Sequence, residues 1–477
     1  MNFFNDFIKV DLKKNMVLYN LTDEFFCVYL NSVRLKNNNI LVVVDTIFEA
    51  NKLYNNLSLF CDDVYLFPMD DFLTSEALAV SPDLMIKRLE TINSIVSREN
   101  VIVIANLTAY LRFLPLKNNY IDSILNLKVG AVIAPSDLDN KLVSIGYSRD
   151  TLVTKTGEFG VRGYVVDIFP LNEDNPVRIE FFDDEIESIR YFNVEDQKSI
   201  SKIYSIKINP IFEFLTSKVV EEEHFGKQKY LQCYEDVCNI SSYLDNCITV
   251  FKDYDQIKTS YIGVLNEMFD YKSETDKNFK YNYMFDFNEI NVDYQIYYFS
   301  LNNYIYNDYV DELISFNLKP IVNFNEDSEK INSFINMCIK DNKTVVICLK
   351  KFQIRSILKY LNMKIIETDF DNIKVGFVNI VESELNKGFI YQDLVVLTAL
   401  ELFNDTSSRK KYVTKFKYST GIKDINKLNI GDYVVHNTHG IGCYNGIKTL
   451  TLGDVTKDYL EVLYQGTDKI YIPVEKI

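Results

Sequence analysis

The sequence predicts a multidomain α/β protein with an inserted β-rich domain, a second small α/β domain and a β-rich C-terminal domain. At 477 residues the chain is too long for one ordinary domain, and its 47% hydrophobic content is typical of soluble proteins with substantial cores. Continuous apolar runs such as ILVVVD and TVVICL alternate with helix-like segments, which predicts strands buried on both faces of parallel sheets. Two other regions show short strands with period-two alternation and glycine punctuation, which predicts β-rich domains.

The first α/β module is expected at residues 1–115. Its predicted strands are NMVLYN, ILVVVD, DVYLFP and NVIVIANL. Its predicted helices are DEFFCVYLNSVRL with Thr22 as cap, TIFEANKLYNNLSLF, and SPDLMIKRLETINSIVS with Ser81 as cap and Pro82 at the first position. Layers of this kind bind nucleotides at the carboxyl ends of their strands.

Changes in pattern set the other boundaries. SSYLDNCITVFKD is expected to be a helix end followed by a buried strand, while DSEKINSFINMCIKDN, TVVICL and DLVVLTALELF supply a helix and strands of the second α/β domain. The expected parts are a β-rich domain at 116–205, a return segment that completes the first module at 206–285, a small α/β domain of unknown role at 286–405, a charged linker at 406–425 and the final domain at 426–477.

Charge and cysteine usage indicate the setting. The formal net charge of −16 argues against nucleic acid as the main partner, because phosphate binding needs a basic surface, and it favours protein partners. The eight cysteines are scattered and form no CxxC pair, which is typical of a reduced, cytoplasmic protein. The N-terminus carries charges where a signal peptide has its apolar core, and no apolar run is long enough to span a membrane. No membrane partner is expected.

The first strand-to-helix loop of the first module lacks the residues that nucleotide binding needs. Phosphate binding there needs glycines and a lysine, but LYNLTDEFF has neither and places Asp23 and Glu24 at the helix start. The pattern GxxxxGK[ST] occurs nowhere in the sequence. We therefore expect a degenerate site and no bound cofactor.

Motifs for catalysis or metal binding are weak. His436, His439 and Cys443 form one His/Cys cluster, but a structural zinc site normally needs four ligands and no second pair is at hand. The acidic run that begins at Asp183 is better explained by a hairpin turn, since Asp favours turns. His224 is expected on a solvated face, and no nucleophile–base set can be argued. The chain is expected to be non-catalytic and metal-free.

The stretch PVRIEFFDDEIESIRYF contains the most informative pattern. In a strand, alternate side chains face opposite sides, so one row is apolar and the other polar. These rows are Val177, Ile179 and Phe181, and Arg178, Glu180 and Phe182. A phenylalanine in line with an arginine is the composition expected of an interface hot spot. The alternative is that Phe182 packs under a neighbouring loop or the adjoining module.

Two segments resemble known domains. GEFGVRGYVVDIFPLNEDNPVRIEFFDDEIESIRYFNVEDQKSI resembles the second domain of bacterial transcription-repair coupling factors (the Mfd family), which the excision-repair protein UvrB also carries. LNIGDYVVHNTHGIGCYNGIKTLTLGDVTKDYLEVLYQGTDKIYIPVEKI resembles the RNA-polymerase-interacting domain that these factors share with CarD-type regulators. Weaker similarity at LFPMDDFLTSEALAVSPDLMIKRLETI and VESELNKGFIYQDLVVLTALELF extends the resemblance to the whole chain. It implies a UvrB-like, degenerate helicase-type α/β module and a C-terminal Tudor/SH3-like β-barrel.

The resemblance also implies partners. The damage-recognition protein UvrA is expected to bind the positions of this sequence that match the family's contact residues: Arg162, Arg178 and Phe182. In our hypothesis the two arginines pair with carboxylates on UvrA and Phe182 fills an apolar pocket. The last domain is expected to dock on the β subunit of RNA polymerase, with Ile447, Leu450 and Leu452 as candidate contacts, although the leucines are equally explained as core.

The resemblance further implies an adaptor. It predicts a non-catalytic, N-terminal part of a coupling factor that links stalled RNA polymerase to UvrA, and in which the UvrA surface is unmasked. The ATPase and DNA translocase activity, its ATP and magnesium, and most DNA contact are expected only of motor domains that this sequence lacks. The alternatives are a UvrB-like ATP-dependent excision-repair subunit and a CarD-like RNA-polymerase-binding transcription regulator.

Overall fold

The protein divides into two units, Met1–Thr414 and Lys415–Ile477. The structure is a computed structural model that describes residues 12–36, 38–70, 82–275, 279–292, 294–300, 310–359, 361–370, 372–404, 431–436, 440–452, 455–464 and 469–473. The linker expected at 406–425 and the Ser81 cap lie outside these residues. No helix within the described ranges is both long and apolar enough to cross a membrane.

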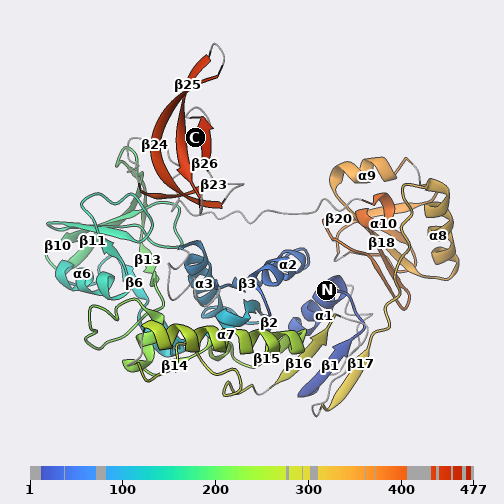
Figure 1. Cartoon of the computed structure of the whole chain (residues 1–477), viewed down its shortest axis with the longest axis horizontal. Coiled ribbons are helices and arrows are strands. Elements are labelled where there is room, and N and C mark those ends of the chain that lie inside the picture. The colour runs from blue at the N-terminus through green and yellow to red at the C-terminus, as the bar shows by residue number, and fades with distance from the viewer. Residues whose placement is uncertain are drawn as a thin grey trace. The chain divides into compact units, whose positions relative to one another are not determined.

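A seven-stranded parallel sheet forms the centre of the first unit (Figure 1). Its order is β17-β1-β16-β15-β2-β4-β3. Every residue of β2 is buried, as the continuous apolar run predicts. The strands are β1 (Asn15–Tyr19), β2 (Asn39–Val44), β3 (Val64–Phe67), β4 (Ile102–Asn106), β15 (Cys247–Lys252), β16 (Gln295–Phe299) and β17 (Glu312–Ser315).

Two of these strands correct the expected domain boundary. The sequence assigned β16 and β17 to the second α/β domain at 286–405, but both pair in register with β1, near the start of the chain. The physical reason is that β1 lies inside the sheet, so its backbone groups need a strand on each side. A short apolar run shows that a strand exists without showing which sheet it joins.

Helices cover this sheet: α1 (Asp23–Arg34), α2 (Ile47–Leu57), α3 (Pro82–Ile95), α4 (Leu107–Tyr110) and α7 (Tyr254–Thr275). Thr22 caps α1 as predicted, because its Oγ1 accepts from the Phe25 backbone N–H at 3.3 Å. The 22-residue α7 is not predicted from the sequence. Its helical period is carried by few buried residues, among them Ile257, Tyr261 and Met268.

The β-rich domain contains a six-stranded sheet in the order β12-β11-β10-β9-β8-β7. It also has two helices that period-two alternation did not predict, α5 (Lys117–Asp122) and α6 (Pro135–Ser144). Leu138 and Leu142 of α6 pack into the core of this sheet. Its strands are β7 (Ser148–Arg149), β8 (Glu158–Arg162), β9 (Val165–Ile168), β10 (Val177–Phe182), β11 (Glu185–Phe192) and β12 (Ser199–Ile203), and β13 (Ser205–Ile208) pairs separately with β6 (Leu125–Lys128).

The return segment brings the chain back to the first module. It contains the 3₁₀ helices η3 (Gln228–Cys233) and η4 (Ile240–Tyr243), and β14 (Val237–Cys238) pairs with β5 (Leu114–Pro115). The last of these 3₁₀ turns precedes β15, as the expected helix end and buried strand predict.

The second α/β domain has its own sheet, in the order β19-β20-β18-β22-β21. Only β21 runs antiparallel to its neighbour among the described strands of this sheet. Its elements are α8 (Ser328–Lys340), β18 (Thr344–Leu349), α9 (Lys351–Ile357), β19 (Ile365–Thr368), β20 (Val378–Glu382), β21 (Phe389–Tyr391), β22 (Leu394–Thr398) and α10 (Ala399–Phe403).

The second unit is strand-rich, as predicted. Four strands form one antiparallel sheet in chain order. They are β23 (Tyr433–His436), β24 (Gly440–Leu452), β25 (Val455–Leu463) and β26 (Lys469–Pro473).

Candidate functional site

Strand β10 has the two faces that its sequence predicts. Its apolar row lies in the core, with Phe181 only 5% exposed, whereas Phe182 is 75% exposed. The turn after it is a tight hairpin in which Asp183 has a φ of 57°, which explains the acidic run as turn chemistry. Phe182 is therefore not packed under a neighbouring loop, and the hot-spot interpretation keeps its structural basis.

A buried carboxylate organises the arginines beside it. Asp167 of β9 lies directly opposite Arg178 of β10, and Arg178 donates from Nε to Oδ1 at 2.7 Å and from Nη2 to Oδ2 at 2.9 Å. Asp167 pairs with Gly160 of β8, so Arg162, two residues further along β8, is its diagonal neighbour. Arg162 Nη2 donates to the same Oδ2 of Asp167. The structure thus brings Arg162 and Arg178 together on one acid that the sequence analysis did not single out.

The two arginines differ in how far they reach solvent. The Arg178 side chain is 15% exposed, its Nη2 also donates to Gln197 Oε1 at 3.1 Å, and its guanidinium lies 4.5 Å from the ring centre of Phe192. The hydrogen bonds that Arg178 donates to Asp167 raise the pKa of Arg178 above its ordinary value. The Arg162 side chain is 50% exposed. Both guanidinium groups already donate hydrogen bonds to Asp167. This modifies the expectation that both arginines are free to pair with a partner's carboxylates.

A second acid on the same face is satisfied in a similar way. Glu180 of β10 accepts from Ser188 Oγ at 2.7 Å and from Arg190 Nη1 at 2.8 Å, both on β11. These contacts, the Ser188 bond first, hold the pKa of Glu180 below its usual range. The outer face of the sheet therefore carries fixed, alternating charges, and Phe182 stands at its end.

An exposed valine extends this end of the face. Glu185 pairs with Phe182 on one side and forms an isolated bridge with Val132 on the other. Both Phe182 and Val132 are largely exposed. Opposed residues of an antiparallel pair point to the same side of a sheet, so the two apolar side chains flank Glu185.

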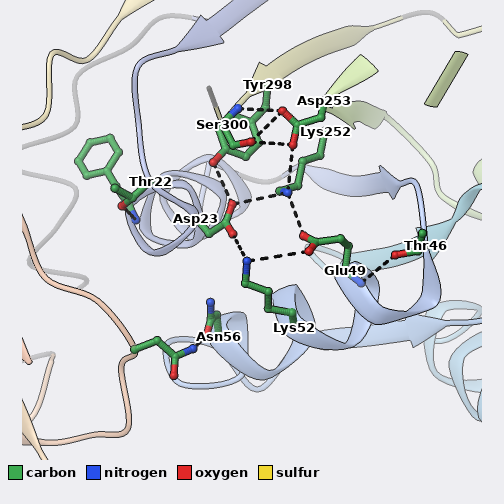
Figure 2. Close-up of polar contacts among 12 residues, drawn as sticks. Thr22, Asp23, Thr46, Glu49, Lys52, Asn56, Lys252, Asp253, Tyr298 and Ser300 are labelled. Atoms are coloured by element: carbon green, nitrogen blue, oxygen red, sulfur yellow. Dashed lines mark hydrogen bonds and ion pairs between the residues drawn. The ribbon is translucent and has the colours of Figure 1, made fainter. Parts of the chain in front are cut away.

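The start of α1, where a nucleotide would bind, is filled by the protein's own charges (Figure 2). Asp23 accepts from Lys52 Nζ of α2 at 2.7 Å, and Lys252 Nζ at the end of β15 lies 3.6 Å from the other Asp23 oxygen. Lys252 also contacts Glu49 Oε2 at 3.0 Å and Asp253 Oδ2 at 3.2 Å. These groups gather at the carboxyl ends of the parallel strands, which is the edge where such sheets bind ligands.

The buried lysine and carboxylates of this cluster stabilise each other's charged forms. Burial by itself would lower the pKa of Lys252, but Asp23, Asp253 and Glu49 raise it instead. Burial would raise the pKa of Asp23, but the two lysines hold it below its usual range. Figure 2 shows Tyr298 and Ser300 closing the cluster, through Tyr298 Oη to Asp23 at 3.0 Å and Ser300 Oγ to Asp253. The helix dipole and both lysines are thus neutralised by carboxylates of the chain.

The candidate polymerase residues lie on two long paired strands. Ile447 of β24 is 48% exposed and pairs with Leu460 of β25. Leu450 and Leu452 pair with Lys457 and Val455 in the same ladder, and their side chains are outside the described part of the chain. The structure therefore supports exposure for Ile447 and leaves the two leucines as predictions.

The His/Cys cluster gains no support as a metal site. His436 ends β23 and Cys443 lies across the ladder on β24, while His439 falls outside the described residues. Within the ranges that the structure describes, no group of three or more His, Cys, Asp or Glu side chains could hold a metal ion.

Comparison with protein families identifies two domains. Residues 125–214 match the UvrB interaction domain, and residues 428–477 match the CarD-like/TRCF RID domain. The first match contains the whole face built on β8, β9 and β10, and the second contains the four-stranded sheet. Both are interaction domains, and neither describes a catalytic domain.

Curated relatives extend the similarity to the whole chain. The transcription-repair-coupling factor of Bacillus subtilis is 30% identical over 97% of this chain and 44% of its own length. Those of Staphylococcus epidermidis and Staphylococcus aureus are each 28% identical, over 100% and 92% of this chain and 46% and 43% of their own lengths. The chain thus spans less than half the length of these relatives. The two matched domains and this similarity along the whole chain relate it to the transcription-repair-coupling factors.

Proposed function

We propose that this chain is a non-catalytic adaptor that links RNA polymerase, through its β subunit, to the excision-repair protein UvrA. The observation that carries the proposal is the presence of two interaction domains in one chain, at 125–214 and 428–477. More than 200 residues separate them, so two partners can be engaged by different surfaces. The acidic net charge of −16 also favours proteins over nucleic acid as direct partners.

The UvrA-binding surface of this proposal is the outer face of β8, β9 and β10. Phe182 is the apolar anchor, since an exposed aromatic ring in a rigid strand loses little conformational entropy on binding. Arg162 supplies a half-exposed side chain on the same face, and Arg178 completes the charged row. An interface of standard size would bury about 800 Å² on this partner.

The polymerase-binding surface is the paired β24 and β25. We propose Ile447, Leu450 and Leu452 as contacts and a Tudor/SH3-like barrel as the fold of the domain, supported by the four antiparallel strands in chain order. A long exposed strand can also bind its partner by strand pairing.

The first module is proposed to be UvrB-like with a degenerate, nucleotide-free site. Asp23 stands at the helix start with Lys52 and Lys252 already paired to carboxylates, so a triphosphate would meet negative charge. All eight cysteines are free, which suits the reducing cytoplasm proposed as its location.

The test is a bridging experiment. RNA polymerase is immobilised and UvrA is added with the chain, without it, and with a variant that carries Phe182→Ala. The proposal predicts that UvrA is retained only with the unmodified chain. Retention of the chain without UvrA would favour the CarD-like regulator, and ATP binding by the chain would favour the UvrB-like alternative.

A further inference from the structure

The exposed arginine of the β8–β9–β10 face depends on a residue that cannot itself contact a partner. Asp167 is 3% exposed, yet both of its oxygens are used: Oδ1 by Arg178, and Oδ2 by Arg178 and Arg162. Its position is fixed by β9, which pairs with β8 on one side and β10 on the other. One buried carboxylate in a rigid strand therefore sets the direction of two guanidinium groups.

The chemistry makes this arrangement directional. A carboxylate that accepts two parallel N–H bonds fixes the plane of a guanidinium, and Arg178 is further held by Gln197 and the ring of Phe192. Arg162 has no such second support among its described contacts, and half of its side chain is in solvent. Without Asp167, the long Arg162 side chain would have to lose its rotamer freedom when it binds, and two guanidinium groups would repel each other.

We propose that Asp167 is the positioning residue of this surface. It holds Arg162 in a binding-ready orientation on the face that ends in Phe182, and its pair with the largely buried Arg178 fixes its own position, so that a carboxylate on the partner meets a pre-oriented guanidinium. This inference rests on the proposed function, in which the partner of the face is UvrA. It also divides the predicted trio by role, because Arg162 and Phe182 reach outward while Arg178 works mainly through Asp167.

The chain offers a matched control. Glu180 lies on the same face, also accepts from an arginine, and is more exposed than Asp167, but among the described contacts it forms no hydrogen bond or ion pair with Arg162 or Arg178. Removing its charge changes the net charge of the face by the same amount as removing that of Asp167. A difference in UvrA binding between the two variants then reflects where the carboxylate lies and not the loss of one negative charge.

The experiment measures UvrA binding by calorimetry, with thermal unfolding to check each variant. Asp167→Asn is expected to weaken binding at least about tenfold, the scale of a lost buried charge-pair contact, and by clearly more than Glu180→Gln does. In an Arg162→Ala background, Asp167→Asn should weaken binding much less than it does in the parent chain, because the residue it positions is gone. A general loss of structure would instead weaken binding equally in both backgrounds.

A second variant keeps the test decisive if Asp167→Asn does not fold. Asp167→Glu retains the charge and moves it by one methylene, and it should bind more weakly than the parent chain while remaining folded. The inference is overturned if Asp167→Asn, or in its place Asp167→Glu, binds as tightly as the parent chain, or if the effects of Asp167→Asn and Arg162→Ala simply add. Absence of binding by the parent chain would instead overturn the proposed function, and this inference with it.

Discussion

Glu213 accepts a hydrogen bond from Arg88 at 2.6 Å in a place where both side chains are only 1% exposed. Its other oxygen accepts from Arg112 Nε, also at 2.6 Å. Arg88 belongs to α3 and Glu213 lies beyond the β-rich domain, 125 residues later. This buried triad joins the return segment to the first module.

Replacing Glu213 should therefore destabilise the first unit strongly. Glu213→Gln leaves two buried guanidinium groups without a counter-charge, and breaking such a pair costs about 3–5 kcal/mol. Urea unfolding followed by circular dichroism measures the loss. The control is Glu90→Gln, which breaks a partly exposed pair with Lys87 and should cost less than about 1 kcal/mol. A similar effect of both variants would contradict the structural role of the triad.

Phe181 and Phe182 are neighbours with opposite roles. Phe182→Ala should leave the unfolding midpoint nearly unchanged and should weaken UvrA binding by at least about 2 kcal/mol, or roughly thirtyfold. Phe181→Ala should destabilise the β-rich domain by about 3–5 kcal/mol, because Phe181 is buried in its core. Calorimetry and thermal unfolding of the two variants separate the effects. A destabilised Phe182→Ala variant would show that its ring is not free at the surface.

Glu24 should make stability depend on pH. It is buried in the first turn of α1, and burial raises its pKa from 4.5 to about 7. A raised folded-state pKa means that its contribution is fully present below pH 4.5 and is lost as the pH rises through 7. The free energy of unfolding should fall by up to about 3 kcal/mol across this window. Glu24→Gln should abolish that part of the pH profile, and an unchanged profile would contradict it.

Lys252 should be the central residue of the charge cluster at the start of α1. Lys252→Met removes the cation shared by Asp23, Glu49 and Asp253. Among the described ion pairs, Asp23 and Glu49 then keep only those with Lys52, and the partly buried Asp253 loses its own, so the change should cost about 3–5 kcal/mol. Lys13→Met, which breaks a more exposed pair with Glu312, is the control and should cost less than about 1 kcal/mol. Equal effects in urea unfolding would contradict the view that the cluster is a structural replacement for a ligand.

Ile447 should matter for polymerase binding without supporting the fold. Ile447→Asp should weaken binding to the β subunit of RNA polymerase by at least about 2 kcal/mol, since it buries a charge in the proposed contact. Leu460→Ala, across the ladder and buried, should instead lower the unfolding midpoint. Binding that survives Ile447→Asp would remove this residue from the proposed surface.

Local patterns in the sequence predict which side chains of a strand are buried and where a helix begins. Alternation in PVRIEFF separates Phe181 from Phe182 because the side-chain period of a strand is two, and the structure confirms it. The Thr22 cap and the buried run of β2 follow from equally local rules. The loop after β1 has acids in place of glycine and lysine, so the sequence alone predicts a degenerate site there, whereas the lysines that pair with Asp23 come from other segments.

Only the tertiary structure decided the relationships between distant segments. Asp167 acquires its role from the register of β8, β9 and β10, and a period within one strand says nothing about register between strands. Lys252 meets Asp23 across more than 200 residues because parallel strands bring their carboxyl ends to one edge. The sequence by itself determined which face each local segment buries, since that depends on its own periodicity. Strand order and register determined which buried faces and charges meet, because those depend on packing among segments far apart in the chain.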